Sequence, residues 1–469
     1  MDNKEDNVKK LKEKLFLKRE NGGKTIPKDE LDKSYSFAEG YKDFLNKSKT
    51  EKESVRYALK CAKESGFEEF DKSKKYKAGD RVYKINRDRN IVLAVIGKSG
   101  TKNGVNMAVA HVDAPRLDLK PNPLMEQHDL GILKTHYYGG IKKYQWTTIP
   151  LAIHGRIVKR DGSVVDVVLG ESEDEPCFCV TDLLPHLARE QMGKKMSEAI
   201  MGEDLNLLVG SLPLEDGGDG SDMVKLNILK LLNEKYGIVE GDFISSDLEI
   251  VPAMKAQDVG FDRSMIGGYA HDDRSCAYPS LRAILDCKNP EKTTITMLTD
   301  KEETGSDGNT GSQSKFLEYF ISDLAEIDGV LVRDVLTHTK CLSADVNAAY
   351  DPTYPSSFEP ANSSYINRGV VVTKYTGSGG KYGTSDATAE FTGEICNLLS
   401  DKNVIWQSSE LGKVDVGGGG TIAKYVANLN ADVIDIGVPV LSMHAPFEVI
   451  SKIDLYMTFK AVSAFFGNI

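Results

Sequence analysis

The pattern of apolar and polar positions divides this chain into three stretches of different character. In the first stretch, helices are predicted over residues 4–16 and over about residues 35–65; in the second of these, apolar side chains recur at the i, i+3, i+4, i+7 spacing at Val55, Ala58, Leu59 and Ala62. Short apolar runs then predict strands at residues 81–85, 91–96 and 105–110. The last of these strands would carry His111 at its carboxyl end.

The second stretch, residues 119–245, has the short runs and turns typical of antiparallel strands. Asp161-Gly162 is a strong hairpin signal between two apolar runs, at residues 151–158 and 164–169. A later helix is expected, with a Gly- and Asp-rich loop before it at residues 215–221, a cap at Ser221 or Asp222 and an end at Gly237. The pattern therefore predicts a β-rich domain here.

In the third stretch, residues 246–469, predicted strands alternate with predicted helices. The strands are expected at residues 293–299, 341–346, 369–375, 403–407 and 432–436, and the helices at residues 272–285, 313–327, 386–399 and 453–466. Such alternation predicts an α/β fold with a mainly parallel central sheet flanked by helices. Because the first stretch has the same character, we expect one catalytic domain built from residues 1–118 and 246–469, with the β-rich residues 119–245 inserted into it.

Composition narrows the class of protein. The chain has 469 residues, enough for two or three domains, and its net charge of −11 disfavours nucleic acid and anionic membranes as partners. Its 7 cysteines include no CxxC pair, which indicates reduced thiols and not a disulfide framework. No apolar run approaches a signal peptide or the roughly 20 residues of a membrane span, so a cytoplasmic location is expected.

The candidate chemistry begins with the adjacent acids Glu302 and Glu303, which follow the strand predicted at 293–299. Two neighbouring carboxylates repel each other, and this raises the pKa of one of them. A bound cation would remove that cost, leaving one carboxylate as a ligand and the other to carry a proton. Taken alone, these residues favour a solvated acidic turn, so the metal hypothesis depends on further ligands elsewhere in the chain.

Four further positions supply the missing partners. Loops at the carboxyl ends of parallel strands converge on one crevice, and the predicted strands and helices bring a His or an acid there at His111, Asp272, Asp345 and His444. Two His and three carboxylates suit a pair of divalent ions, with zinc expected and cobalt or manganese accepting the same ligands. Asp113 lies two residues after His111 and is expected to fix the tautomer of that imidazole. The remaining histidines are interpreted as structural or solvated: His128, His136, His154, His271 and His338.

The motifs closely resemble those of the M18 family of metalloaminopeptidases, the aspartyl aminopeptidases, within the dinuclear-zinc exopeptidase clan. The matching segments are Ala110-His111-Val-Asp113-Ala-Pro115, His271-Asp272-Asp273, Asp300-Lys-Glu302-Glu303-Thr-Gly305-Ser306, Ser343-Ala-Asp345-Val and Met443-His444. The resemblance covers nearly the whole chain. It implies that His111 and Asp345 hold one metal ion, that Glu303 and His444 hold the other, and that Asp272 bridges the two. Glu302 would be the general base for a metal-bridging hydroxide that attacks the peptide bond, and would then pass the proton to the leaving amine.

The same resemblance implies an assembly and a substrate. The inserted domain would make a dimer, and dimers would build a dodecamer in which His186 reaches the active site of a neighbouring subunit. Lys374 and Tyr382 match positions that line the substrate pocket of the family. The substrates would be peptides with a free N-terminus, and Asp or Glu is the expected N-terminal residue.

Other readings stay open. The Asp272-Asp273-Arg274 and Met443-His444-Ala-Pro446 segments are similar to the M42 aminopeptidases, which favours a broad-specificity or deblocking enzyme. Asp273 competes with Asp272 as the bridging ligand, and the match to the family motif favours Asp272. A glycosidase would need two carboxylates about 5–9.5 Å apart, which adjacent residues do not readily provide. A non-catalytic scaffold is disfavoured because every expected ligand position is filled.

Overall fold

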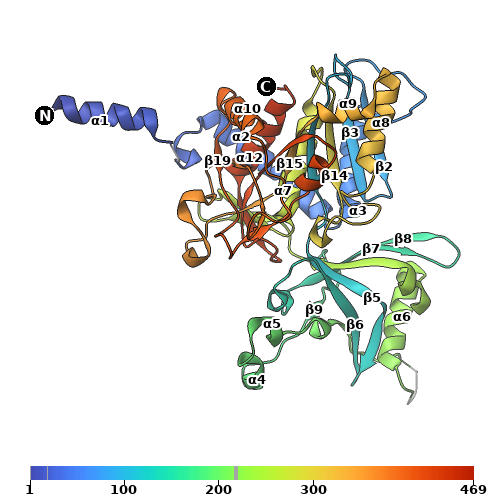
Figure 1. Ribbon diagram of the computed structural model, residues 1–469. Helices are drawn as coiled ribbons and strands as arrows, with labels where there is room; N and C mark the ends of the chain where they lie inside the picture. The colour runs from blue at the N-terminus through green and yellow to red at the C-terminus, as the bar shows by residue number, and fades with distance from the viewer. Residues whose placement is uncertain (1, 18–19, 216–219) are drawn as a thin grey trace.

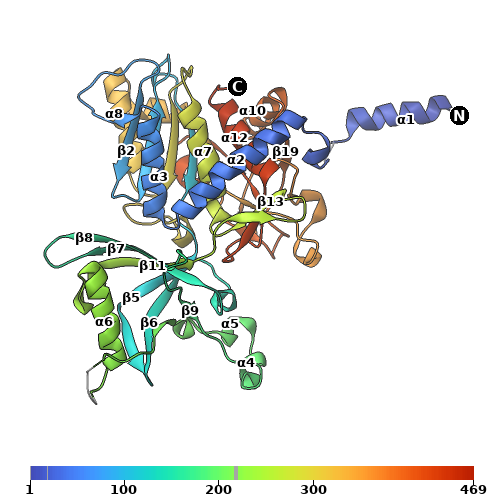
Figure 2. The same ribbon diagram turned by 180° about the vertical axis from the view of Figure 1, so that it is seen from behind.

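The computed structural model describes residues 2–17, 20–215 and 220–469, with side chains described from Asp6 onwards in the first range. Figures 1 and 2 show two lobes joined near the centre of the molecule, and helix α1 (Asp2–Leu15) extends away from both. No helix among the described residues has the length and hydropathy required to cross a membrane.

The larger lobe is organised around a sheet of 9 strands. In order across the sheet they are β1 (Glu68–Glu69), β2 (Arg81–Asn86), β3 (Asn90–Val95), β14 (Thr294–Thr299), β4 (Asn106–His111), β15 (Lys340–Ala344), β21 (Asp432–Gly437), β17 (Val370–Thr373) and β19 (Trp406–Ser408). The central strands β14, β4, β15 and β21 pair in parallel, whereas β3 and β17 run antiparallel to the strands that they flank. The sheet is therefore mixed, with a parallel centre.

Both faces of this sheet are covered by helices. Successive side chains of a strand point to opposite faces, so each strand contributes to two separate hydrophobic cores. In β3, Leu93 packs into the core on one face, and Val92 and Ala94 pack into the core on the other. The first face is covered by α2 (Lys28–Lys47), α3 (Glu51–Glu64), α7 (His271–Asp286), α10 (Ala389–Asp401) and α12 (Lys452–Phe465). The second is covered by α8 (Phe316–Asp328), α9 (Val332–Thr337) and α11 (Ala423–Ala427).

The second lobe contains a fully antiparallel sheet of 7 strands, all of them from residues 116–252. Its order is β8 (Val164–Leu169), β7 (Leu151–Val158), β11 (Ser246–Pro252), β5 (Arg116–Gln127), β6 (Leu130–Tyr138), β10 (Leu207–Gly210) and β9 (Cys179–Val180). The lobe has a core of its own, in which Trp146 is fully buried, and its helices are α4 (Arg189–Met192), α5 (Met196–Ala199) and α6 (Met223–Tyr236). The hairpin predicted at Asp161-Gly162 is present.

A third sheet, of 5 short strands, belongs to the larger lobe and has no counterpart among the predicted elements. Its order is β12 (Gln257–Val259), β13 (Met265–Gly268), β23 (Glu448–Ser451), β22 (Pro439–Leu441) and β16 (Asn347–Ala348). A two-stranded sheet joins β18 (Gly377–Ser378) to β20 (Gly418–Gly419). The β13–β23 pairing brings residues near 268 and 448 side by side.

Two of the local predictions are wrong. The helix expected over about 35–65 is two helices, because Thr50 and Glu53 form a capping box that begins α3 after α2 has ended. The backbone of Asp222, next to α6, has a φ of 62°, and its side chain makes no capping hydrogen bond. Gly237 ends that helix in a left-handed conformation as predicted. Part of the loop expected at 215–221 lies outside the described residues.

Candidate metal centre

Three of the predicted ligands meet at one edge of the nine-stranded sheet. His111 is the last residue of β4, Asp345 follows β15 directly, and Glu303 lies in the short helical turn Glu302–Thr304 after β14. β14 and β15 both pair with β4 in parallel, so the carboxyl ends of the three strands lie next to one another. The strand order thus brings these three side chains together at one edge of the sheet, as the sequence predicted.

The other two predicted ligands lie next to the small third sheet and not the large one. Asp272 follows β13 at the start of α7, where Asp272 and Asp273 have non-helical backbone angles and are joined by a cis peptide bond. His444 lies in the loop between β22 and β23. The sequence identified both residues, but it placed them at the edge of the same open sheet as the others.

Asp272 lies between the two histidines. Its Oδ1 is 3.2 Å from Nε2 of His111, and its Oδ2 is 3.1 Å from Nε2 of His444. On the outer sides, His111 Nε2 lies 3.9 Å from Asp345, and His444 Nε2 lies 3.6 Å from Glu303. One carboxylate therefore directs an oxygen to each half of the site, which is the arrangement that a bridging ligand requires.

The competing residue Asp273 is directed differently. Its Oδ2 accepts the backbone N–H of His111 at 3.3 Å, so this oxygen holds the backbone at the end of β4. Ligand atoms of Asp273, His111 and Asp345 nevertheless lie within 4.8 Å of one another, as do those of His111, Asp272 and Glu303. Two groups of potential ligands therefore share His111, and Asp272 alone of the two acids also contacts His444.

Both imidazole rings are held through the nitrogen that faces away from the cluster. Nδ1 of His111 lies 3.0 Å from the carbonyl oxygen of Asp113, and Nδ1 of His444 lies 2.8 Å from the carbonyl oxygen of Gly140. Donation of Nδ1–H to a carbonyl fixes the tautomer in which Nε2 carries a lone pair. Both Nε2 atoms are then free to bind a cation.

Asp113 also holds the turn that carries the adjacent acids. Its Oδ1 accepts the backbone N–H of Glu302 at 3.1 Å, and its Oδ2 accepts the N–H of Glu303 at 3.2 Å and the hydroxyl of Tyr138 at 2.8 Å. Asp113 is fully buried, and although burial acts to raise its pKa, the bonds from His111 and Tyr138 outweigh this and lower it. An ionised Asp113 thus anchors both Glu302 and Glu303 beside His111.

The electrostatics of the cluster favour the binding of a cation. Burial, followed by repulsion from Asp272, raises the pKa of Glu303 well above its usual value, and burial raises the pKa of Asp345 in the same direction. Burial acts to lower the pKa of His444, but Asp272 and Glu303 outweigh it and raise that pKa to about 10. Asp272 Oδ1 and Glu303 Oε1 are buried without a hydrogen-bond partner. Buried oxygens of this kind and imidazole nitrogens are the donors that Zn²⁺ accepts, so the residues fit a metal site.

Glu302 differs from its neighbour in position and exposure. Its Oε2 lies 4.0 Å from Nε2 of His111, and 19% of its side chain is exposed, compared with 4% for Glu303. Burial, together with the nearby Asp272 and Asp113, raises the pKa of Glu302 to about 7. A carboxylate with a pKa near neutrality at the open side of the cluster is suited to accept and release a proton.

Two residues with clear contacts in the site were missed by the sequence interpretation. Glu448, at the start of β23, accepts the backbone N–H of Asp272 and that of His444, and Tyr138 donates to Asp113. Glu448 lies four residues after His444, so its position next to the motif was the available signal. Tyr138 belongs to the Tyr137-Tyr-Gly-Gly segment, whose path to the turn is set by the end of β6.

The three predicted substrate residues are not brought to the cluster by any ion pair or hydrogen bond found among the described residues. Lys374 pairs with Asp386 at 3.1 Å, and Asp386 also pairs with Lys381 at 2.9 Å. Tyr382 is 78% exposed, and His186 is exposed on the second lobe. Their roles therefore stay predictions.

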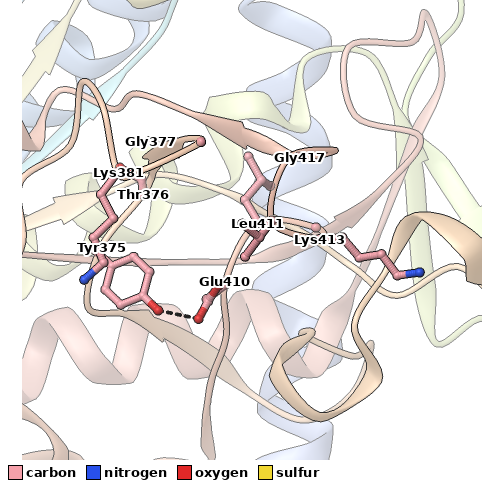
Figure 3. A pocket seen from close by; sticks show the side chains of 11 residues that line it. Tyr375, Thr376, Gly377, Lys381, Glu410, Leu411, Lys413 and Gly417 are labelled. Carbon is pink, nitrogen blue, oxygen red and sulfur yellow. Dashed lines mark hydrogen bonds between the residues drawn. The ribbon is translucent and has the colours of Figure 1, made fainter.

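Between Lys374 and Tyr382 in the sequence lie residues that line a cavity of about 210 Å³ (Figure 3). Tyr375 donates a hydrogen bond to Glu410 across this cavity, and the ammonium of Lys381 lies 3.6 Å from the centre of the Tyr375 ring. That hydrogen bond raises the pKa of Tyr375 to about 12. The cavity offers cationic, anionic and apolar groups, and its walls are the glycine-rich segments near 377 and 417.

A fold and a site of this kind define a class, the zinc-dependent exopeptidases, and the comparisons identify the family. Residues 44–466 match the model of the family described as aminopeptidase I zinc metalloprotease (M18). A probable M18 family aminopeptidase 1 of Clostridium acetobutylicum is 51% identical over 447 residues, which cover 94% of this chain and 96% of that protein. A protein of the same description from Thermotoga maritima is 44% identical, over 95% of this chain and 98% of its own length.

Solved structures agree with the sequence comparisons. The crystal structure of an M18 aminopeptidase from Thermotoga maritima superposes with a TM-score of 0.91 at 42% identity, over 97% of this chain and 100% of that one. Aminopeptidase I from Clostridium acetobutylicum gives 0.90 at 46% identity, over 96% of this chain and 100% of that one. This chain belongs to the M18 family of zinc metalloproteases, which confirms the resemblance seen in its motifs.

Proposed function

We propose that this chain is a dinuclear metal-dependent aminopeptidase that removes the N-terminal residue of peptides. The observation that carries the proposal is Asp272, whose two oxygens lie 3.2 and 3.1 Å from the Nε2 atoms of His111 and His444. His111 and Asp345 would hold one divalent ion, Glu303 and His444 the other, and Asp272 both. The chain belongs to the M18 family of zinc metalloproteases, and its relatives are described as aminopeptidases; both facts support this chemistry.

Divalent ions bound there would polarise the scissile carbonyl group and lower the pKa of the attacking water. Glu302 takes the proton of that water, since its carboxyl group lies beside the proposed ligands, with Oε2 4.0 Å from Nε2 of His111. The same carboxyl group then gives the proton to the leaving amine. Asp113 keeps Glu302 in place through the backbone bond at 3.1 Å and holds the imidazole of His111 in the required tautomer.

The second lobe is proposed as the dimerisation domain, predicted over residues 119–245 between the two parts 1–118 and 246–469 of the catalytic domain. Its strands extend slightly beyond these bounds, from Arg116 to Pro252. Its separate core and antiparallel sheet support an independent unit. A Saccharomyces cerevisiae mApe1 dodecamer, 21% identical with a TM-score of 0.74, has the same fold. We propose self-association to dimers and a dodecamer, in which His186 would reach a neighbouring active site. A cytoplasmic location is part of the same proposal.

The preferred N-terminal residue is the finer part of the proposal. Lys374 would attract an acidic side chain, with Tyr382 beside it, but Asp386 neutralises Lys374 and Lys381 together. An arrangement with two cations and one carboxylate keeps about one net positive charge, which supports a moderate acidic preference. A broad-specificity enzyme is the second candidate, and the pairing of Lys374 favours it.

The test is a metal-dependent activity profile. Protein stripped with a chelator and reconstituted with zinc, cobalt or manganese is assayed on peptides that differ only in the N-terminal residue. We expect no turnover without metal, full recovery on reconstitution and no cleavage of peptides with an acetylated N-terminus. Cleavage of acetylated peptides at an equal rate would contradict an aminopeptidase.

A further inference from the structure

A buried carboxylate on β23 joins two of the proposed ligands through their backbones. Glu448 is 1% exposed; its Oε1 accepts the N–H of His444 at 2.7 Å, and its Oε2 accepts the N–H of Asp272 at 3.1 Å. The two residues it joins come from different loops, and Glu448 lies 176 positions from Asp272 in the sequence. Both oxygens are therefore used to hold proposed ligand residues.

The two halves of the site differ in how their ligands are anchored. The N–H groups of His111 and Asp345 have other acceptors: that of His111 donates to Asp273 of α7 at 3.3 Å, and that of Asp345 donates to the carbonyl oxygen of Ile436 in β21 at 2.9 Å. His444 and Asp272 lie in loops of the small sheet, and the N–H groups of both are taken by Glu448. Because Asp272 is proposed to serve both ions, Glu448 anchors two ligand residues of the half built on His444, but only the shared Asp272 of the other half.

We propose that Glu448 is a positioning residue that assembles the half of the metal centre formed by His444 and Glu303, by clamping His444 to the bridging Asp272. The inference rests on the proposed function for the identity of the ligands. Glu448 touches neither substrate nor metal in this role. Residues that orient ligands from outside typically change metal affinity by about 10–100-fold when they are altered.

Glu448→Gln is the informative change, because the amide has nearly the same shape but only one acceptor oxygen. In either orientation its NH₂ group would face a backbone N–H, so one of the two ligand residues loses its anchor. The chain offers a matched control in Asp454, which is fully buried and accepts the N–H groups of Asn367 and Gly369 at 2.7 and 2.6 Å. Asp454→Asn breaks a clamp of the same kind at residues that are not proposed ligands.

The measurement is a zinc titration of the metal-free full chain against a competing chelator. We expect two equivalents to bind to the wild type, one of them about 10–100-fold more weakly in Glu448→Gln, and wild-type affinities in Asp454→Asn. Unchanged binding in Glu448→Gln, an equal loss at both equivalents, or the same loss in Asp454→Asn would overturn the clamp. A wild type that binds no zinc would instead overturn the proposed function.

A second readout needs no metal. Hydrogen exchange of the metal-free wild type should show the amides of Asp272 and His444 protected, because Glu448 holds both N–H groups. In Glu448→Gln at least one of these amides should exchange faster, while those of Asn367 and Gly369 stay unchanged. Rapid exchange of both ligand amides in the wild type would contradict the proposal even if the variant did not fold.

Discussion

The substitution Asp113→Asn tests how the catalytic turn is held, and its effect can be worked from the contacts. Each oxygen of Asp113 serves two donors: Oδ1 lies 3.1 Å from the N–H of Glu302 and 3.3 Å from Nδ1 of His111, and Oδ2 lies 3.2 Å from the N–H of Glu303 and 2.8 Å from the hydroxyl of Tyr138. Asparagine removes one of these oxygens, so two donors lose their partner.

Hydrogen bonds to a charged group contribute about 1.5–3 kcal/mol each. The loss is reduced because Nδ1 of His111 keeps the carbonyl oxygen of Asp113, and because the hydroxyl of Tyr138 can turn to the Thr304 hydroxyl 3.5 Å away. We therefore expect the free energy of unfolding to fall by about 3 kcal/mol, the lower end for two such bonds.

The assay is denaturant unfolding with excess chelator, so that metal binding does not contribute. Tyr138→Phe is the control, because the Arg116 guanidinium lies 4.0 Å from the centre of the Tyr138 ring and would still pack against it. Removing this single donor should cost about 1.5 kcal/mol. If Asp113→Asn costs less than Tyr138→Phe, Asp113 does not hold the turn.

The remaining predictions concern pH and specificity. Burial acts to lower the pKa of His154, but Glu171 and Glu53 raise it to about 9, above the value of about 6.5 expected when unfolded. The protonated His154 thus contributes about 3 kcal/mol to the free energy of unfolding; this contribution is complete below pH 6.5 and is lost as the pH rises through 9. The difference in unfolding free energy between the wild type and His154→Gln should therefore disappear over that range. A difference that does not change with pH would refute the prediction. Asp386→Asn removes the carboxylate that pairs with Lys374, so the ratio of kcat/KM for peptides with N-terminal Asp to that for peptides with N-terminal Ala should rise. Lys374→Ala should lower the same ratio. An unchanged ratio in both variants would exclude Lys374 from the substrate pocket.

Much of the large sheet could be predicted because its signals are local. The buried strands β3 and β4 consist mostly of apolar residues and are bounded by polar ones, and the helices of this lobe follow the 3.6-residue period. The ligands at the carboxyl ends of these strands follow from the same reasoning. The break between α2 and α3 was also readable, since Thr50 and Glu53 stand at the spacing of a capping box.

The small sheet could not be predicted in the same way. β13 and β22 are only 4 and 3 residues long and contain glycine or proline, so neither shows a period. Their positions are fixed by pairing with β23, almost 200 residues further along the chain than β13. For the same reason the role of Glu448 was invisible, because it depends on backbone N–H groups that only this long-range pairing brings within reach.

The central claim is that Glu302 moves the proton while Glu303 and four other residues hold the metals, and Glu302→Gln tests it most directly. Metal content and turnover are measured on the same preparation of the variant. The account predicts two bound metal ions per chain, as in the wild type, with turnover lowered by about 10²–10⁴-fold. Turnover near the wild-type rate would contradict the assignment of the base, and loss of a metal ion would show that Glu302 is a ligand.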